Sequence, residues 1–299
     1  MQPIAVAVIH GAGIQKEDFA EILIENLQKK LEKWLKDQGR TYTGKEFIFQ
    51  PIYWGEVFNQ REKDLWEAVQ KSDRLDFSVL RKFVIEFLGD AIAYQPTSDQ
   101  FQNYEQVHEI YFKALTKLSE KAGAKAPLIV IGHSLGTVIT SNLFYDLQKT
   151  SDRMAYIEEW TENATPLEKG ETLARFISLG SPLALWSLRY TDFDRPIKVP
   201  SWGFYKHYPD GEGGWWNIYD RDDILAYPLK TISDAYGMVI QEDREVNTGN
   251  LLTSWNPASH FQYVKDKQIL NLLTEQLTEL FQSVNKDDRI SHLRSEEID

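Results

Sequence analysis

Two short, uninterrupted runs of apolar residues constrain the fold of this chain more than any other feature. Ile4–Ile9 and Leu128–Ile131 contain no polar residue, which is typical of strands covered on both faces of a sheet. A glycine-containing turn and a helical pattern follow each run. In the first helical pattern, Glu17–Gln38, apolar residues recur at intervals of three and four. Strands that alternate with helices in this way predict a mostly parallel sheet with helices on both faces.

The remaining segments extend this alternation and interrupt it once. Phe47–Trp54 is aromatic and β-branched, and Pro51 within it favours an edge strand or a strand end. Helical patterns then occupy about residues 55–100, which predicts a helical insertion after an early strand. The later chain is predicted to contain a helix at about Tyr104–Ala122, a helix through about Gln148, a polar loop at Thr150–Gly170, buried strands at Phe176–Leu179 and Trp215–Tyr219, and a final helix that carries Ile269 and Phe281.

These elements predict one α/β domain over residues 1–284, followed by a polar C-terminal tail at 285–299. Within the insertion, the apolar residues of Phe77–Ile92 leave two interpretations open. The helix either forms a lid over a substrate pocket or packs on the sheet. In sheets of this kind the chemistry lies beyond the carboxyl ends of the strands, so the residues directly after each apolar run are the candidates for a site.

Composition excludes several classes of partner. The chain has 33 basic and 45 acidic residues, a formal net charge of −12, and no long basic cluster. This argues against nucleic-acid binding. No apolar run approaches the roughly 20 residues of a membrane-spanning helix, and Ile4–Ile9 lacks the flanks of a signal peptide. The absence of cysteine excludes disulfides and thiolate zinc sites. A cytoplasmic location is the default expectation.

The strongest chemical motif is Gly132-His133-Ser134-Leu135-Gly136, which lies between a predicted buried strand and a helix. A G-x-S-x-G sequence in this setting predicts a nucleophile elbow, a tight turn that lifts the serine hydroxyl above the sheet. Such a turn leaves little room for side chains two residues before and after the serine, and glycine occupies both positions. Ser134 is therefore the candidate nucleophile, and the backbone N–H of Leu135 is a candidate donor to an oxyanion.

A serine hydroxyl needs a base that takes its proton and a carboxylate that orients the base. Of the six histidines, His260 is the candidate base, because it follows the candidate acids in the chain order serine, acid, histidine. Three aspartates, at positions 220, 222 and 223, follow the predicted strand at Trp215–Tyr219. We choose Asp223, because the apolar residues after it can anchor its carboxylate, and Asp220 is the alternative.

A second oxyanion donor is expected at the end of the first strand. His10-Gly11-Ala12-Gly13 lies there, and its glycines allow the backbone to approach a substrate closely. The backbone N–H of Ala12 is the candidate. The alternative is a phosphate-binding loop, but the third glycine of a dinucleotide motif and the lysine of a P-loop are both missing.

Taken together, these segments resemble the lipase-like serine esterases of the α/β-hydrolase superfamily. The resemblance rests on His10–Gly13, Gly132–Gly136, Gly180–Leu183, Asp223–Leu225 and Ser259–Tyr263, and it covers most of residues 1–283. It implies a triad of Ser134, Asp223 and His260 with Ala12 and Leu135 as oxyanion donors. It also implies that no metal and no organic cofactor takes part.

The function predicted from these features is hydrolysis of a carboxylic ester through an acyl-enzyme intermediate. The expected partner is a small-molecule or lipid ester. Two alternatives keep the same fold. The first is an acyltransferase or thioesterase with the same triad, and the second is a non-catalytic protein that binds a ligand.

Overall fold

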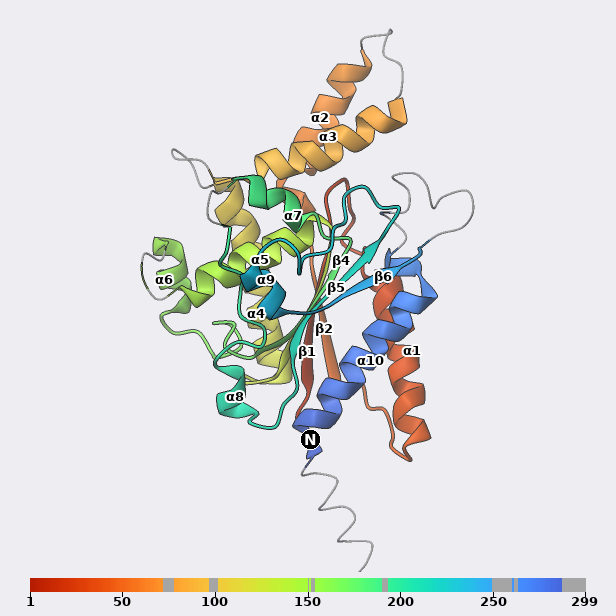
Figure 1. The fold of residues 1–299 in the computed structure, drawn as a ribbon, viewed down its shortest axis with the longest axis vertical. Helices are drawn as coiled ribbons and strands as arrows, with labels where there is room; N and C mark the ends of the chain where they lie inside the picture. The colour runs from red at the N-terminus through yellow and green to blue at the C-terminus, as the bar shows by residue number, and fades with distance from the viewer. Residues whose placement is uncertain are drawn as a thin grey trace, which may run out of the picture.

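In the described part of the chain, a six-stranded sheet forms the centre of the molecule (Figure 1). The computed structural model describes residues 1–71, 78–96, 102–149, 151, 154–189, 193–248, 260 and 263–286. Each pair of neighbouring strands is parallel, and the strand order is β2-β1-β3-β4-β5-β6. The strands are β1 (Ile4–Ile9), β2 (Phe47–Ile52), β3 (Leu128–His133), β4 (Leu173–Leu179), β5 (Gly214–Asp220) and β6 (Ile240–Val246).

Helices cover both faces of this sheet, which confirms the predicted fold class. The α-helices of the described residues are α1 (Glu21–Asp37), α2 (Asn59–Gln70), α3 (Ser78–Ala93), α4 (Gln102–Ala122), α5 (Leu135–Gln148), α6 (Ala155–Thr161), α7 (Leu183–Trp186), α8 (Phe204–His207), α9 (Asp234–Val239) and α10 (Lys267–Val284). Short 3₁₀ turns, labelled η1, η2 and η4, lie at Gly55–Val57, Ser187–Arg189 and Tyr263–Lys265. No helix in the described part of the chain has the length and apolar character that crossing a membrane requires.

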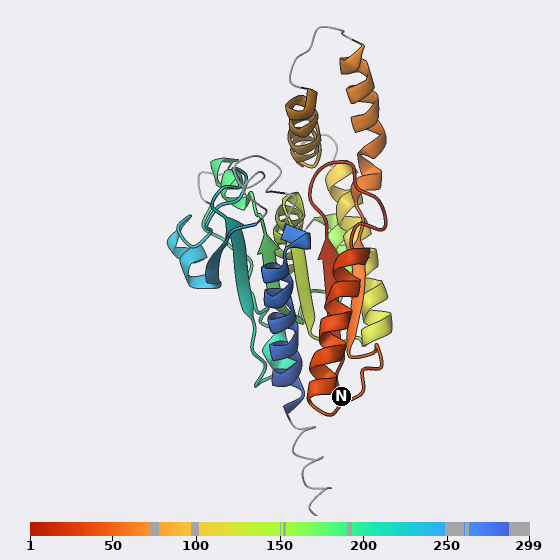
Figure 2. The same ribbon diagram turned by 90° about the vertical axis from the view of Figure 1, so that its right-hand side faces the viewer.

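The core has two parts, one on each face of the sheet, and β1 contributes side chains to both. Successive side chains of a strand point to opposite faces. In β1, Ala5, Ala7 and Ile9 belong to one buried cluster with residues of α4 and α5. Ile4 and its alternate neighbours belong to a second cluster with α1 and α10, which lie side by side on that face (Figure 2). A strand buried on both faces therefore has no place for a polar residue.

One expectation about local structure is wrong, and one strand has no counterpart among the predicted elements. The segment predicted as polar loop, Thr150–Gly170, contains α6, because Tyr156 and Ile157 turn inward and join the core beside α4 and α5. The strand β6 was not predicted, because its sequence IQEDREV buries only the two ends, Ile240 and Val246. A partly exposed edge strand does not show the continuous apolar run that marks β1 and β3.

The packed body reaches Asn285, the first residue of the predicted tail. Its side chain accepts a hydrogen bond from the Gln2 backbone N–H at 2.7 Å and donates one to the Gln2 carbonyl oxygen at 3.1 Å. The C-terminal end of α10 is thereby joined to the N-terminus. Residues 287–299 of the predicted tail lie outside the described residues.

In the sequence, the helices α2 and α3 come between β2 and α4. In space they project beyond the carboxyl edge of the sheet (Figures 1 and 2). The apolar residues predicted for α3 do not share one environment. Phe87 is buried in the core, whereas Val84, Leu88 and Ile92 are 42%, 48% and 72% exposed. Phe77 lies outside the described residues. The helix therefore packs through one face and leaves an apolar face uncovered in this structure.

Candidate active site

Ser134 occupies a strained turn between β3 and α5. Its backbone has φ 52° and ψ −129°, and no other non-glycine residue in the described part of the chain has a positive φ. Residues with a side chain rarely adopt this conformation, because the Cβ atom crowds the backbone. The Ser134 N–H donates to the Leu179 carbonyl oxygen at 2.9 Å, and the Thr137 N–H donates to the Ser134 carbonyl oxygen at 2.9 Å. These bonds hold the turn, and Ser134 therefore lies at the N-terminal end of α5.

The two glycines of the motif contribute unequally. A Cβ atom on Gly136 would lie 2.4 Å from the His10 carbonyl oxygen, whereas one on Gly132 would meet its nearest neighbours at 3.4 Å, an ordinary contact. The prediction that both positions must lack a side chain therefore holds strictly only for Gly136. Its absent side chain lets α5 pack directly against the end of β1.

Alanine at these two positions is expected to give opposite results. Gly136→Ala forces the His10 backbone to move and should lower the free energy of unfolding by about 1–3 kcal/mol or more. Gly132→Ala should change it by less than about 1 kcal/mol. Urea unfolding of both variants measures the difference. An equal loss of stability in the two variants would contradict the packing described for Gly136.

The structure brings Ser134, His260 and Asp223 together in one hydrogen-bonded chain. Ser134 Oγ lies 2.6 Å from His260 Nε2, and His260 Nδ1 lies 2.8 Å from Asp223 Oδ2. The three side chains come from the end of β3, the turn after β5 and the segment before α10, and all three residues are at least 97% buried. Ser259, Phe261 and Gln262 of the motif around the histidine lie outside the described residues.

The Asp223 carboxylate is held by several donors. Its Oδ1 accepts the Leu225 N–H at 3.0 Å, and its Oδ2 accepts the Tyr263 hydroxyl at 2.9 Å in addition to His260. Burial alone raises the pKa of Asp223, but these hydrogen bonds and the attraction of His260 outweigh it and hold the pKa below its usual value. The carboxylate therefore stays ionised beside the histidine.

The alternative acid, Asp220, has a structural role. Its Oδ1 accepts the Asp222 N–H at 2.9 Å, and its Oδ2 accepts the backbone N–H and the hydroxyl of Thr248 at 2.5 and 2.7 Å. The Asp220 N–H in turn donates to the Tyr263 hydroxyl at 2.7 Å. Asp220 thus fixes the turn that carries Asp223 and does not contact His260.

Two residues near the histidine were missed in the sequence, although both lie inside the motifs. Tyr263 links Asp223 to the Asp220 backbone, as described above. His133 donates from Nε2 to the His260 carbonyl oxygen at 2.8 Å. Burial, and next the electrostatic effect of the neighbouring His260 ring, lower the pKa of His133 to about 3, so its ring stays neutral. His133 and His260 are 127 residues apart in the sequence, and Tyr263 and Asp220 are 43 residues apart, so no local pattern reveals these contacts.

The predicted loop His10–Gly13 lies directly against Ser134. A Cβ atom on Gly11 would lie 2.5 Å from Ser134 Cβ and 3.1 Å from its Oγ, so only glycine fits there. His10 Nε2 accepts the backbone N–H groups of Trp54 and Gly55 at 3.2 and 3.3 Å, so its proton resides on Nδ1. Burial, against the opposing effect of the Gly11 hydrogen bond, lowers the pKa of His10 to about 4 and keeps the ring neutral.

The His10 ring also orients the peptide bond that bears the Ala12 N–H. His10 Nδ1–H donates to the Gly11 carbonyl oxygen at 2.7 Å. In a trans peptide the carbonyl and the following N–H point in opposite directions. The Ala12 N–H therefore points away from the His10 ring, on a peptide that borders the Ser134 side chain.

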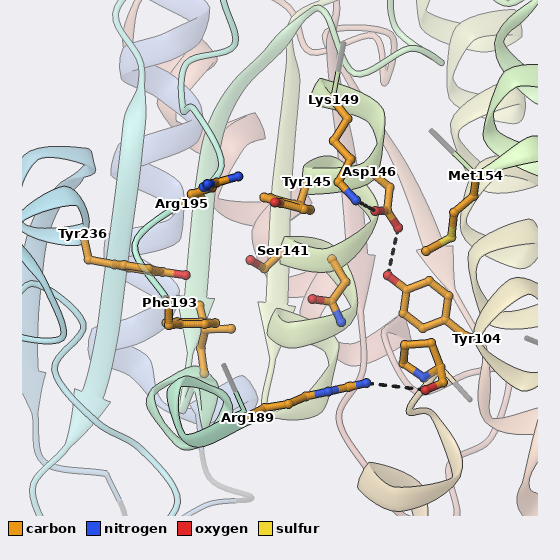
Figure 3. A pocket seen from close by; sticks show the side chains of 13 residues that line it. Tyr104, Ser141, Tyr145, Asp146, Lys149, Met154, Arg189, Phe193, Arg195 and Tyr236 are labelled. Carbon is orange, nitrogen blue, oxygen red and sulfur yellow. Dashed lines mark hydrogen bonds and ion pairs between the residues drawn. The ribbon is translucent and has the colours of Figure 1, made fainter. Parts of the chain in front are cut away.

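Figure 3 shows a separate cavity of about 400 Å³ along α5. Its lining includes Ser141, Tyr145, Asp146, Arg189 and Tyr236, but not Ser134, Asp223 or His260. None of the three residues of the hydrogen-bonded chain therefore borders this cavity. In the described part of the chain, no group of three or more histidine, aspartate or glutamate side chains is arranged to hold a metal ion.

Neither a scan against protein-family models nor a search of curated proteins finds a match for this chain. Among solved structures, it is similar to a crystal structure from Xanthomonas campestris pv. campestris that is described as a candidate hydrolase of the alpha/beta superfamily. The two share 11% sequence identity with a TM-score of 0.36, and the similarity covers 91% of this chain and 98% of that chain. A similarity at this level assigns neither an activity nor a substrate, so the chemistry of this chain has to be inferred from its own side chains.

Proposed function

We propose that this chain is a serine hydrolase that cleaves carboxylic esters through an acyl-enzyme intermediate. The observation that carries the proposal is the unbroken hydrogen-bonded chain from Ser134 through His260 to Asp223 at a strained turn. A base within hydrogen-bond distance of a serine, itself oriented by a carboxylate, is the arrangement that activates a serine nucleophile.

In the first half of the reaction, Ser134 Oγ attacks the ester carbonyl carbon while its proton passes to His260 Nε2. The carbonyl π electrons move onto the oxygen, which becomes an oxyanion. When the carbonyl re-forms, the bond to the alcohol oxygen breaks, and the leaving oxygen takes the proton from His260. In the second half, water attacks the acyl group with the same proton transfers, and the acid and the free serine are released.

Two backbone groups are proposed to stabilise the oxyanion. The Leu135 N–H follows the nucleophile at the N-terminal end of α5, where the helix dipole also favours negative charge. The Ala12 N–H lies on the peptide held by His10 beside Ser134. Asp223 holds His260 with its proton on Nδ1, which leaves Nε2 ready to accept the serine proton, and stabilises the imidazolium that then forms.

Labelling with a fluorophosphonate tests this proposal directly, because the reagent reacts only with an activated serine. We expect a single adduct on Ser134, located by mass spectrometry, and no adduct in Ser134→Ala. Well-folded protein that is not labelled and does not cleave esters would overturn the proposal and favour the ligand-binding alternative.

Analysis of the reaction products distinguishes hydrolysis from acyl transfer. With a 4-nitrophenyl ester in the presence of an added alcohol or thiol, a hydrolase yields the free acid as its main product. An acyltransferase yields the new ester or thioester instead. Analysis of the acyl product by mass spectrometry therefore decides between the two reactions.

A further inference from the structure

Two carboxyl side chains of the insertion are buried against each other beside the proposed active site. Glu62 on α2 and Asp90 on α3 are 7% and 1% exposed, and the negative charge of Asp90 acts directly on Glu62. Within the described residues, no N–H or hydroxyl donor reaches either oxygen of Glu62 or Oδ1 of Asp90. Two buried carboxyl groups close to each other and without a donor avoid mutual repulsion only when one of them carries a proton. A proton shared by the pair would supply the donor that these oxygens lack.

The other oxygen of Asp90 reaches the loop beside Ser134. Asp90 Oδ2 accepts the Gly13 backbone N–H at 2.9 Å, a contact that spans 77 residues of sequence. Gly13 has φ +92°, and its Cα faces Glu86 of the same helix, where a Cβ atom would lie 3.4 Å from Glu86 Oε2. The loop that contains Ala12 is thus held at one end by His10 and at the other by Asp90.

A second contact connects α3 to the histidine. Phe87 is 5% exposed, and its ring lies edge-on to the His260 ring with centroids 6.5 Å apart. One turn of α3 therefore contacts both the loop His10–Gly13 and the proposed base. The insertion is part of the site in this structure and does not merely cover it.

We propose that Asp90 is a positioning residue that fixes the loop His10–Gly13, and that the proton shared with Glu62 keeps it there. This inference rests on the proposed function, because the loop carries the proposed oxyanion donor Ala12. When the shared proton is lost, two buried carboxylates face each other without a donor between them. Their repulsion separates α2 from α3 and loosens the hold of Asp90 on Gly13.

The charged groups around the pair favour the protonated form near neutral pH. Burial, followed by the negative charges of Asp90 and Glu86, raises the pKa of Glu62. Burial also raises the pKa of Asp90, against the opposing effect of the Gly13 hydrogen bond. Lys82 Nζ lies 3.6 Å from Glu86 Oε1, and its positive charge partly offsets these negative charges. From the loop side the contact is the uncharged Gly13 N–H.

Stability should follow the same titration. A carboxyl group whose pKa is higher in the folded than in the unfolded protein adds stability below the unfolded pKa, and this stability is lost as pH rises through the folded pKa. We therefore expect the melting temperature to fall between about pH 5 and about pH 9. In Glu62→Gln the decrease should be smaller, because the glutamine amide donates to Asp90 without titrating. Parallel pH dependences in the two proteins would contradict the shared proton.

Steady-state kinetics with 4-nitrophenyl acetate test the positioning role. Asp90→Ala should lower kcat by about 10-fold or more with little change in KM, because an oxyanion donor acts in the transition state. Asp90→Asn should restore most of kcat at neutral pH, since its amide oxygen still accepts the Gly13 N–H. The wild-type kcat should decrease at alkaline pH, and this decrease should be absent in Asp90→Asn and Glu62→Gln. Asp64→Asn, an exposed change on α2, is the control for altered charge.

Hydrogen exchange separates failure of this inference from failure of the proposed function. In a Ser134→Ala background, where no turnover is needed, Asp90→Ala should speed amide exchange in the peptide that contains Gly13, and Asp90→Asn should not. Unchanged exchange together with wild-type kcat in Asp90→Ala would overturn the inference while fluorophosphonate labelling of Ser134 still supports the function. Faster exchange in a protein that no ester or fluorophosphonate modifies would support the contact and refute the function.

Discussion

Ser134→Ala is expected to reduce ester turnover by roughly 10⁴- to 10⁶-fold, the range found when a triad serine is removed. The alanine cannot form the acyl-enzyme, and His260 loses the partner at 2.6 Å from its Nε2. The remaining backbone donors still bind an oxyanion, so a small rate above that in water should persist. Single-turnover kinetics with a 4-nitrophenyl ester measure the loss. A variant that keeps more than about one-tenth of the wild-type kcat would remove Ser134 from the mechanism.

Ser134→Gly is the matched control, because it separates the nucleophile from the strained backbone. Both variants lack the hydroxyl, so both should be inactive. Alanine keeps the cost of a positive φ, which is about 1–3 kcal/mol, whereas glycine adopts the same backbone without strain. Glycine is also more flexible in the unfolded chain, which offsets part of this gain. The free energy of unfolding of Ser134→Gly should therefore be about 1 kcal/mol higher than that of Ser134→Ala. Equal stability in urea unfolding would mean that the turn is not strained.

The parts of the fold that could be predicted are those in which a local pattern and the tertiary environment agree. Ile4–Ile9 forms β1 with the same bounds, because both faces of that strand are buried. Pro51 indicated an edge, and β2 does lie at one edge of the sheet. The strand β6 and the helix α6 were missed, because each buries only two or three residues and neither shows a continuous apolar run.

The candidate site shows the same division. Ser134 and His260 were chosen from motifs and chain order, and the structure places them in contact. The choice between Asp223 and Asp220 depended on which carboxylate the turn after β5 presents to the histidine, and sequence spacing does not encode that direction. The contact between Asp90 and Gly13 could not be predicted at all, because it joins the insertion to a loop 77 residues away.

The two aspartates should respond to the same substitution in opposite ways. In Asp223→Asn, the oxygen that accepts the Leu225 N–H remains the amide carbonyl, so the amide nitrogen faces His260 Nδ1. An amide N–H donates, which forces Nδ1 to accept and moves the imidazole proton to Nε2. A protonated Nε2 cannot take the proton of Ser134. We therefore expect kcat to fall by about 10⁴-fold with KM nearly unchanged.

Asp220→Asn should instead cost stability and spare catalysis. Three donors reach the Asp220 carboxylate, from the Asp222 and Thr248 backbone N–H groups and the Thr248 hydroxyl. An amide can accept on only one side, so at least one buried donor loses its acceptor, at a cost of about 1–3 kcal/mol. Since Asp220 does not contact His260, kcat should fall by less than about 10-fold. Urea unfolding and kcat for both variants provide the test. If Asp220→Asn loses more activity than Asp223→Asn, the acid has to be reassigned to Asp220, and the hydrogen bond between Asp223 and His260 becomes structural.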